Sequence, residues 1–353
     1  MDLPLRTELA VRGVRAAPPV RRRAGAGPSD DGHFALRGGC SATLPLAPQS
    51  PFALDGDGRL TRDGVVVEDA MVEPIERPRF YDLQTAEGVK YERLARLHGS
   101  DVLATTVVQT CIRYTHEDTR CRFCTIEESL RAGATTQVKR PSELAEVAAA
   151  AVRLDGVRQM VMTTGTSNGP DRGAKHLAKC VRAVKAVVDI PIQVQIEPPL
   201  DLEWIDALAQ AGADAIGIHI ESLDPEVRAR WTPGKATVPL SRYWQAWDRA
   251  VAAFGRNKVS TYLLVGLGED PDELVADAEA LIARGIYPFV VPYRPLVGSL
   301  AHADGVPAPD PATLLGVTLR VGSALAAAGM RGADQGAGCA VCGACSALQA
   351  AGG

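Results

Sequence analysis

The sequence lacks several features that would assign it at once to a broad class of protein. No apolar run reaches the roughly 18 residues that a membrane-spanning helix needs, so no contact with a membrane is expected. Basic residues are not in excess, because 38 lysines and arginines against 42 acidic residues give a net charge of −4. Domains that bind nucleic acid are usually basic, so no nucleic-acid partner is expected. The arginine-rich segment 1–27 has no apolar stretch like that of a secretory signal, which predicts a cytoplasmic protein.

The sequence does have 353 residues of ordinary globular composition and a distinctive arrangement of eight cysteines. Six of them form two triplets, spaced C-x9-C-x2-C and C-x2-C-x2-C: Cys111, Cys121 and Cys124, then Cys339, Cys342 and Cys345. Disulfide frameworks are typical of short secreted chains. In a chain of this length without a secretory signal, close triplets instead predict ligands of a metal ion or an iron–sulfur cluster.

Strand and helix patterns alternate from about residue 101 onward. Apolar runs predict six strands, at 102–108, 159–164, 190–197, 215–221, 259–265 and 287–291. Helical periodicity predicts helices at 141–152, 175–188, 201–211, 240–254 and 270–284. Six strand–helix units with right-handed crossovers imply a parallel sheet that is too short for a closed eight-stranded barrel. The predicted fold is therefore α/β, a partial (β/α)6 TIM-type barrel over residues 101–300.

Extensions are expected on both sides of this barrel. Residues 1–100 form an N-terminal extension, in which turn signals around 55–67 predict a small β region. Residues 301–353 form a C-terminal extension that carries the second cysteine triplet. Of the two remaining cysteines, Cys180 falls on the apolar face of the helix at 175–188 and is expected to be a buried structural thiol.

Two of the predicted strands carry polar side chains where a strand covered on both faces should be apolar. Gln193, Gln195 and Glu197 alternate with apolar residues, and His219 and Glu221 do so on the next strand. Helices cover the outside of a barrel, so these polar faces should point inward. Polar inward residues late in barrel strands commonly serve a ligand site at the carboxyl ends of the strands. Taken alone, His219 is equally consistent with a hydrogen-bonded core histidine.

The first triplet follows the first barrel strand directly, at the catalytic face of such a barrel. Three thiolates can hold three irons of a cubane cluster and leave the fourth iron open to a ligand. Two alternatives remain at this point. One is a zinc site completed by His116, although the nine-residue spacer forms no tight zinc knuckle. The other is a ferredoxin-like cluster, for which a fourth cysteine is missing here.

In the order of its motifs, the segment 102–299 resembles the radical S-adenosylmethionine (SAM) superfamily, and within it the biotin-synthase-like members that act on small molecules. The family motif is usually C-x3-C-x2-C, and this chain has a first spacer six residues longer. The resemblance implies a [4Fe–4S] cluster on the first triplet and SAM as cofactor. It also implies contacts to SAM from residues at successive strand ends: Phe123, Thr163, Thr164, Gly165, Gln195, Glu197, Gly266 and Gly268.

The resemblance further implies a reaction. An electron donor such as flavodoxin or ferredoxin reduces the cluster, SAM is cleaved to methionine and a 5′-deoxyadenosyl radical, and the radical takes a hydrogen atom from a small-molecule substrate. Four residues are candidates for substrate contact or proton handling by their position: His219, Glu221, Tyr293 and Arg294. The alternatives are modification of a peptide or protein and, outside enzymes, an iron–sulfur electron carrier or a zinc-stabilised scaffold.

The second triplet corresponds to the first three ligands of the bacterial ferredoxin run C-x2-C-x2-C-x3-C-P. We predict a second, auxiliary iron–sulfur cluster there; a zinc ion, a disulfide or no metal are the alternatives. Cys40 would supply a fourth ligand if the two ends of the chain meet. A plain buried thiol is an equally good interpretation of Cys40.

Overall fold

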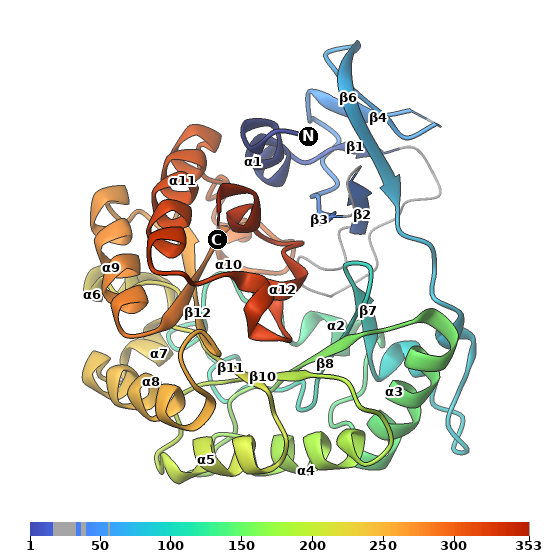
Figure 1. The fold of residues 1–353 in the computed structure, drawn as a ribbon, viewed down its shortest axis with the longest axis vertical. Helices are drawn as coiled ribbons and strands as arrows, with labels where there is room; N and C mark the ends of the chain where they lie inside the picture. The colour runs from blue at the N-terminus through green and yellow to red at the C-terminus, as the bar shows by residue number, and fades with distance from the viewer. Residues whose placement is uncertain (17–32, 37–39, 56, 353) are drawn as a thin grey trace.

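The computed structural model describes residues 1–16, 33–36, 40–55 and 57–352. Its central element is a curved sheet whose strands follow one another in chain order (Figure 1). Six strands pair in parallel: β8 (Val102–Thr106), β9 (Gln159–Thr163), β10 (Ile192–Ile196), β11 (Ala215–Ile218), β12 (Val259–Val265) and β13 (Ile286–Pro292). A seventh strand, β7 (Arg96–His98), pairs with β8 in the antiparallel direction. The predicted partial barrel is confirmed.

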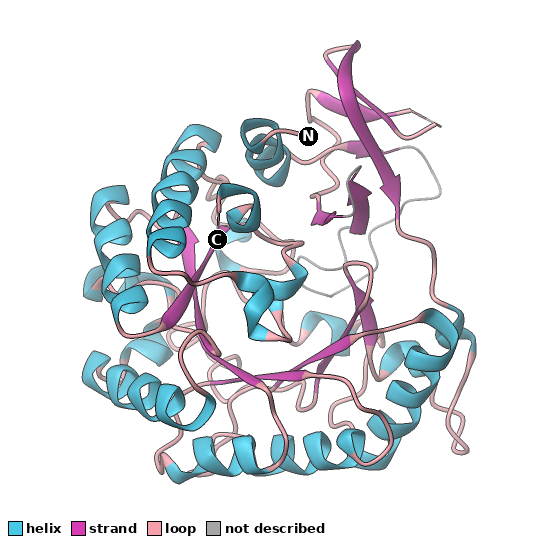
Figure 2. Cartoon of the chain, viewed as in Figure 1, coloured by secondary structure: helices cyan, strands magenta, loops and turns pink. Residues whose placement is uncertain are grey.

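Helices cover the convex face of this sheet (Figure 2). They are α3 (Pro141–Asp155), α4 (Ala174–Lys185), α5 (Glu203–Gln210), α8 (Leu240–Phe254), α9 (Pro271–Ala283) and α11 (Pro311–Ala327). Local sequence explains where several of them begin. Helix α9 starts with Pro271, and the side chain of Asp270 accepts hydrogen bonds from the first free backbone N–H groups. Cys180 is fully buried on the inner face of α4, as predicted.

Shorter helices lie mainly in the loops and in the C-terminal segment. They are α2 (Glu128–Arg131), α6 (Pro225–Trp231), α7 (Pro233–Ala236), α10 (Leu300–Ala303) and α12 (Cys339–Cys342). Single 3₁₀ turns occur at Arg79–Asp82, Tyr91–Arg93, Gly332–Gln335 and Leu348–Ala351. Among the described residues, no helix combines the length and the apolar character needed to span a bilayer.

The N-terminal segment has a helix, α1 (Leu3–Arg12), and a second sheet ordered β1-β4-β5-β6-β2-β3. The strands are β1 (Arg15–Ala16), β2 (His33–Leu36), β3 (Cys40–Thr43), β4 (Phe52–Leu54), β5 (Arg59–Arg62) and β6 (Val65–Pro74). The hairpin β5–β6 turns at Asp63 and Gly64, inside the predicted β region. Leu9, Leu44 and Phe52 belong to a small core of this segment, separate from the barrel core.

The two ends of the chain meet against the barrel. Within the C-terminal segment, Gly338 N–H donates to Gln159 at 2.7 Å and Cys339 N–H to Gln193 at 3.4 Å. Both glutamines lie near the amino ends of their strands, so this segment enters the barrel from that end. The guanidinium of Arg6 donates to the carbonyl oxygens of Gly343 and Ser346 at 2.8 and 3.0 Å. The boundaries at residues 100 and 300 themselves stay a prediction.

Candidate active site

A cavity of about 520 Å³ lies inside the curve of the sheet and is lined by residues of both cysteine triplets. Cys124 and Phe123 border it from the loop after β8, at the carboxyl ends of the strands. Cys339 and Cys345 border it from the C-terminal segment. Several predicted site residues also line it: Thr163, Gln195, Glu221, Tyr293 and Arg294. The barrel thus places residues of both sets of thiols around one cavity.

The loop that carries the first triplet is fixed by its own arginines. Arg120 donates to the hydroxyl of Tyr114 at 2.6 Å, to the carbonyl of Cys124 at 3.0 Å and to that of Gly298 at 2.6 Å. Its guanidinium also lies over the Tyr114 ring, 3.7 Å from the centroid. These contacts hold the C-x2-C half of the triplet against the loop that follows β13.

Gly165, predicted to contact SAM, lies against the backbone of the same loop. Its N–H donates to the carbonyl of Val108 at 2.8 Å, and a Cβ built on it would lie 2.1 Å from the carbonyl oxygen of Thr110. No larger residue fits there. The neighbouring predicted residues bond locally, Thr163 Oγ1 to Thr106 Oγ1 at 2.8 Å and Thr164 Oγ1 to the carbonyl of Gly165 at 3.0 Å.

The three thiols of the first triplet lie close enough to act on one another's ionisation. Burial and the nearby thiols of the triplet raise the pKa of Cys121 well above its ordinary value, and Lys235 opposes this rise. Burial raises the pKa of Cys124 to about 11. Four ligands held about 2.3 Å from one zinc ion lie only about 4 Å apart. In the described part of the chain, no three His, Cys, Asp or Glu side chains converge closely enough to hold a single ion. The ligands of a cluster bind different irons, so a cluster does not require its thiolates to converge on one point.

His116, the alternative zinc ligand, does not support a zinc site. It is exposed, and its carbonyl accepts hydrogen bonds from Thr119 and Arg120 in the turn between the first two cysteines. The structure therefore gives no support to His116 as a fourth ligand of the first triplet. This agrees with the open coordination position predicted there.

Glu197, one of the residues predicted to contact SAM, is bound within the protein. Its carboxylate accepts from Arg113 Nε at 3.0 Å and also from Arg113 Nη2, and Thr166 Oγ1 donates to it at 2.9 Å. Arg113 in turn donates to the carbonyl of Gly234. Arg113 lies two residues after Cys111, so this buried ion pair ties the cluster loop to the end of β10.

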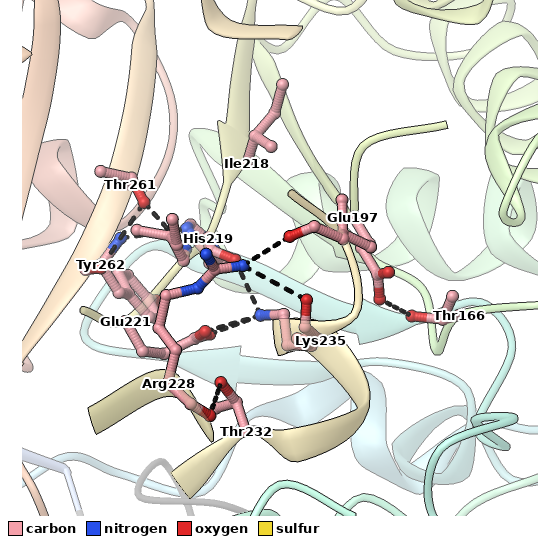
Figure 3. A network of polar contacts seen from close by, with 12 residues as sticks. Thr166, Glu197, Ile218, His219, Glu221, Arg228, Thr232, Lys235, Thr261 and Tyr262 are labelled. Atoms are coloured by element: carbon pink, nitrogen blue, oxygen red, sulfur yellow. Dashed lines mark hydrogen bonds and ion pairs between the residues drawn. The ribbon is translucent and has the colours of Figure 1, made fainter. Parts of the chain in front are cut away.

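Glu221 forms a second buried ion pair in the same region (Figure 3). Lys235 Nζ lies 2.8 and 2.6 Å from the two carboxylate oxygens and 2.7 Å from the carbonyl of His219. Burial alone would lower the pKa of Lys235, but Glu221 reverses the effect and raises it. Glu221 also has φ of 70°, a left-handed conformation that is uncommon for a residue with a side chain. Lys235 therefore keeps its charge close to the first triplet.

His219 is packed against Tyr262 and is neutral. The two rings stack with centroids 4.0 Å apart and an interplanar angle of 7°. His219 Nδ1 accepts from the backbone N–H of Tyr262 at 3.2 Å, and Nε2 has no hydrogen-bond partner among the described residues. Burial and the charge of Lys235 lower its pKa to about 3. A proton-transfer role near neutral pH is not favoured by these surroundings.

The two candidates after β13 differ in their surroundings. Tyr293 packs edge-on against Trp231, with centroids 5.0 Å apart, and its buried hydroxyl has no hydrogen-bond partner in the described residues. Burial raises its pKa to about 12. Arg294 reaches away from the first triplet and donates to the carbonyl of Thr43 at 2.9 Å. Both residues line the cavity, but the hydroxyl of Tyr293 is itself buried.

The turn after β12 contains Gly266 and Gly268, which are predicted to contact SAM. The backbone N–H groups of Gly266 and Leu267 both donate to the carboxylate of Glu269 at 2.8 Å. The carbonyl of Leu267 accepts from the indole N–H of Trp231 at 2.5 Å. The turn is therefore closed by its own acidic residue.

The second triplet lies among polar side chains of the barrel interior. Cys339 Sγ is 2.8 Å from the hydroxyl of Tyr262 and 3.3 Å from the side-chain nitrogen of Gln195. Cys345 Sγ is 3.7 Å from His98 Nε2 and 3.8 Å from Thr43 Oγ1. Burial raises the pKa of Cys339 to about 11, whereas His98 outweighs burial at Cys345 and leaves its pKa lowered to about 7. Gln195, predicted to contact SAM, is bonded to this triplet.

Cys40 cannot be placed beside these thiols, because its side chain lies outside the described residues; its backbone belongs to β3. Several residues of the site had not been predicted. Arg113 and Arg120 lie inside the cysteine spacer, where their position in the sequence was a usable signal. Lys235 and His98 are far from any cysteine in sequence and carried no local signal.

A buried lysine was also missed. Lys139 lines the cavity, and its Nζ donates to Gln109 Oε1 and to the carbonyl of Thr136, both at 2.9 Å. Burial, together with the charge of Arg96, lowers its pKa to about 7. The protein around Lys139 therefore stabilises the charged form of this lysine poorly.

Comparisons with known proteins agree with this arrangement. Residues 118–281 match the Radical SAM superfamily. The chain is 27% identical over 199 residues to bacteriochlorophyllide c C-7(1)-hydroxylase of Chlorobaculum limnaeum, which covers 51% of this chain and 49% of the relative. It is 31% identical over 160 residues to the mitochondrial lipoyl synthase of Saccharomyces cerevisiae, covering 44% of this chain and 36% of the relative. The chain thus matches about half or less of the length of these relatives.

Two solved structures align with part of the chain. The crystal structure of methylornithine synthase (PylB) aligns with a TM-score of 0.49 at 16% identity, over 77% of this chain and 78% of the other. The FeFe-hydrogenase maturase HydG from Carboxydothermus hydrogenoformans aligns with a TM-score of 0.47 at 18% identity, over 64% and 50%. From the matched sequence and the cysteine loop after β8, the chain belongs to the radical SAM superfamily of enzymes, which use a [4Fe–4S] cluster together with SAM.

Proposed function

We propose that the protein cleaves SAM reductively at a [4Fe–4S] cluster on Cys111, Cys121 and Cys124, and uses the resulting 5′-deoxyadenosyl radical to take a hydrogen atom from a small molecule. The observation that carries this proposal is the position of the triplet. Three thiols that act on one another's ionisation lie in the loop at the carboxyl end of β8, and Cys124 borders a cavity of about 520 Å³. The cluster, when bound, supplies the electron for SAM cleavage.

The protein's own residues prepare this site. Arg120 and the Arg113–Glu197 pair fix the cysteine loop, and the Lys235–Glu221 pair holds a cation near Cys121. Charged groups held in fixed positions inside a closed site need no rearrangement during the reaction.

The cavity supports a small molecule over a protein substrate. A volume of about 520 Å³ falls within the roughly 300–1,000 Å³ range of small-molecule pockets. Arg96 and Lys139 both line it, and burial, followed by repulsion from Arg96, disfavours the charged form of Lys139. A negatively charged group on the substrate would relieve that repulsion. We therefore assign the substrate to the class of small molecules that carry an anionic group.

The proposal includes a second iron–sulfur cluster on Cys339, Cys342 and Cys345, at the opposite side of the cavity. It also includes a low-potential electron donor such as flavodoxin or ferredoxin. All seven cysteines whose side chains are described are free thiols. Free thiols are typical of a reducing compartment, which supports a cytoplasmic location.

Anaerobically reconstituted protein, SAM and dithionite test the proposal. Formation of 5′-deoxyadenosine is expected from the wild type and is expected to be lost in Cys124→Ala. Cys180→Ala is the matched control, because it removes a thiol outside both triplets and should retain SAM cleavage. Equal product from Cys124→Ala and the wild type would overturn the proposed function.

A further inference from the structure

A histidine outside every motif of the sequence lies beside the second cysteine triplet. We propose that His98 is the fourth protein ligand of the iron–sulfur cluster held by Cys339, Cys342 and Cys345, and that it binds iron through Nε2. This proposal rests on the auxiliary cluster of the proposed function. It assigns the missing ligand to a residue of β7.

Contacts with two of the three thiols support this assignment. His98 Nε2 lies 3.7 Å from Cys345 Sγ, and the same imidazole interacts with the thiol of Cys342. Cys342 Sγ also lies against the residue that follows His98 in the chain. A Cβ built on Gly99 would be 2.9 Å from this sulfur, and Gly99 has φ of 60°. A glycine there lets the thiol approach the end of β7.

The third thiol is held from the other side. Cys339 Sγ is contacted by Tyr262 and Gln195, which belong to β12 and β10. The triplet is therefore bordered by barrel strands on one side and by His98 on the other. Residues that surround an iron–sulfur cluster in this way set its potential through hydrogen bonds to sulfur.

The chemistry of the donor set fits a cluster. Imidazole replaces thiolate as an iron ligand in the Rieske type of iron–sulfur centre. Three thiolates and one imidazole would give every iron of a cubane a protein ligand. No iron would then be open to the substrate, in contrast with the first triplet.

The test uses full-length protein in which the first triplet is removed by Cys111→Ala, Cys121→Ala and Cys124→Ala together. This triple variant is labelled with ¹⁵N-histidine, reconstituted anaerobically and reduced with dithionite. We expect about four irons per chain. Electron–nuclear double resonance should detect hyperfine coupling to a directly bound histidine nitrogen.

Two further substitutions in this background assign that nitrogen. His98→Ala should lose the coupling, whereas the matched control His302→Gln, which changes an exposed histidine on α10, should retain it. His98→Cys should keep about four irons and lose the coupling, because a fourth thiolate replaces the imidazole. This last variant decides the question if His98→Ala does not fold.

The possible outcomes are distinct. Iron without nitrogen coupling, or coupling that persists in His98→Cys, overturns the assignment of His98. Loss of the cluster in Cys40→Ala together with its retention in His98→Ala identifies Cys40 as the ligand instead and also overturns it. Absence of iron from the triple variant overturns both the auxiliary cluster and its ligand. Failure of the wild type to cleave SAM would overturn only the proposed reaction and would leave a positive nitrogen signal standing.

Discussion

The two cysteine triplets occupy different ends of the same barrel and differ in what surrounds them. The first lies in the loop after β8, and its thiols have cations nearby, Lys235 and Arg120. The second enters from the amino ends of the strands, and its thiols contact Tyr262, Gln195 and His98. In our proposal the first triplet keeps an open coordination position, whereas the second triplet has His98 as its own fourth ligand.

This difference teaches how one fold separates two tasks. Loops at the carboxyl ends of barrel strands vary freely, so a reactive site with an open position is placed there. The amino ends are normally a packed and stabilising face of the barrel. Here that face receives the C-terminal segment, which brings thiols to the inner side chains of β10 and β12. The cavity between them is bordered by both sites.

The largest expected effect separates the triplets by activity. Cys124→Ala should lower SAM cleavage to the background level, at least about a thousandfold, because an essential iron ligand is lost. Cys345→Ala should keep SAM cleavage within about tenfold of the wild type, because it leaves the first triplet intact. Quantification of 5′-deoxyadenosine checks both, with each variant expected to retain about four irons. If the two variants lost cleavage equally, the functional distinction between the triplets would be wrong.

The next prediction concerns the buried cation near the first triplet. In the described part of the chain, the only ion pair of Lys235 is with Glu221. Glu221→Gln removes this carboxylate and leaves the charge of Lys235 buried. Breaking such a pair from one side costs about 3–5 kcal/mol of unfolding free energy. Denaturant unfolding should show this loss, and Glu221→Gln combined with Lys235→Met should recover part of it.

The exposed pair Arg284–Asp248 supplies the control for that measurement. Its side chains are about half exposed, so Asp248→Asn should change the unfolding free energy by no more than about 1 kcal/mol. A loss as large as that of Glu221→Gln would mean that burial does not distinguish the two pairs.

A pH dependence is expected from Lys139 on the cavity wall. Its folded pKa of about 7 lies below the ordinary value of about 10.4, so between these pH values the unfolded chain binds the proton and the folded chain does not. Stability therefore rises with pH in this window, by up to about 1.4 kcal/mol per pH unit. Urea unfolding of the wild type and Lys139→Met between pH 7 and 9 should show this slope in their difference. Parallel stability profiles would contradict the lowered pKa.

The smallest expected effect concerns the potential of the second cluster. Tyr262→Phe removes the hydroxyl 2.8 Å from Cys339 and keeps an aromatic ring against His219. Loss of a hydrogen bond to a cluster sulfur should lower the reduction potential modestly. Redox titration followed by electron paramagnetic resonance should show a shift of the second cluster alone. An equal shift of both clusters would show that Tyr262 acts through the general structure of the barrel.

Sequence periodicity was sufficient for the barrel and for the chain position of the first triplet. The six strands and the helix starts at Pro141 and Asp270 are local features, set by side-chain alternation and by capping chemistry. The buried state of Cys180 follows from the apolar face of α4 in the same way. Strand ends were less well predicted: the strand expected at 215–221 ends at Ile218, and Glu221 adopts a left-handed conformation.

The partners of the polar site residues depended on contacts between distant segments. The sequence predicted three inward-facing polar residues whose partners it did not indicate. Glu197 binds Arg113, Glu221 binds Lys235 and Gln195 binds Cys339, and these contacts span up to 144 positions of sequence. A periodic pattern gives the direction of a side chain and carries no information about which distant group it meets. The sequence by itself thus determined the barrel, the two sets of thiols and the family. Only the tertiary structure decided that both triplets border one cavity and that His98 lies beside the second, because packing brings together groups that the chain keeps far apart.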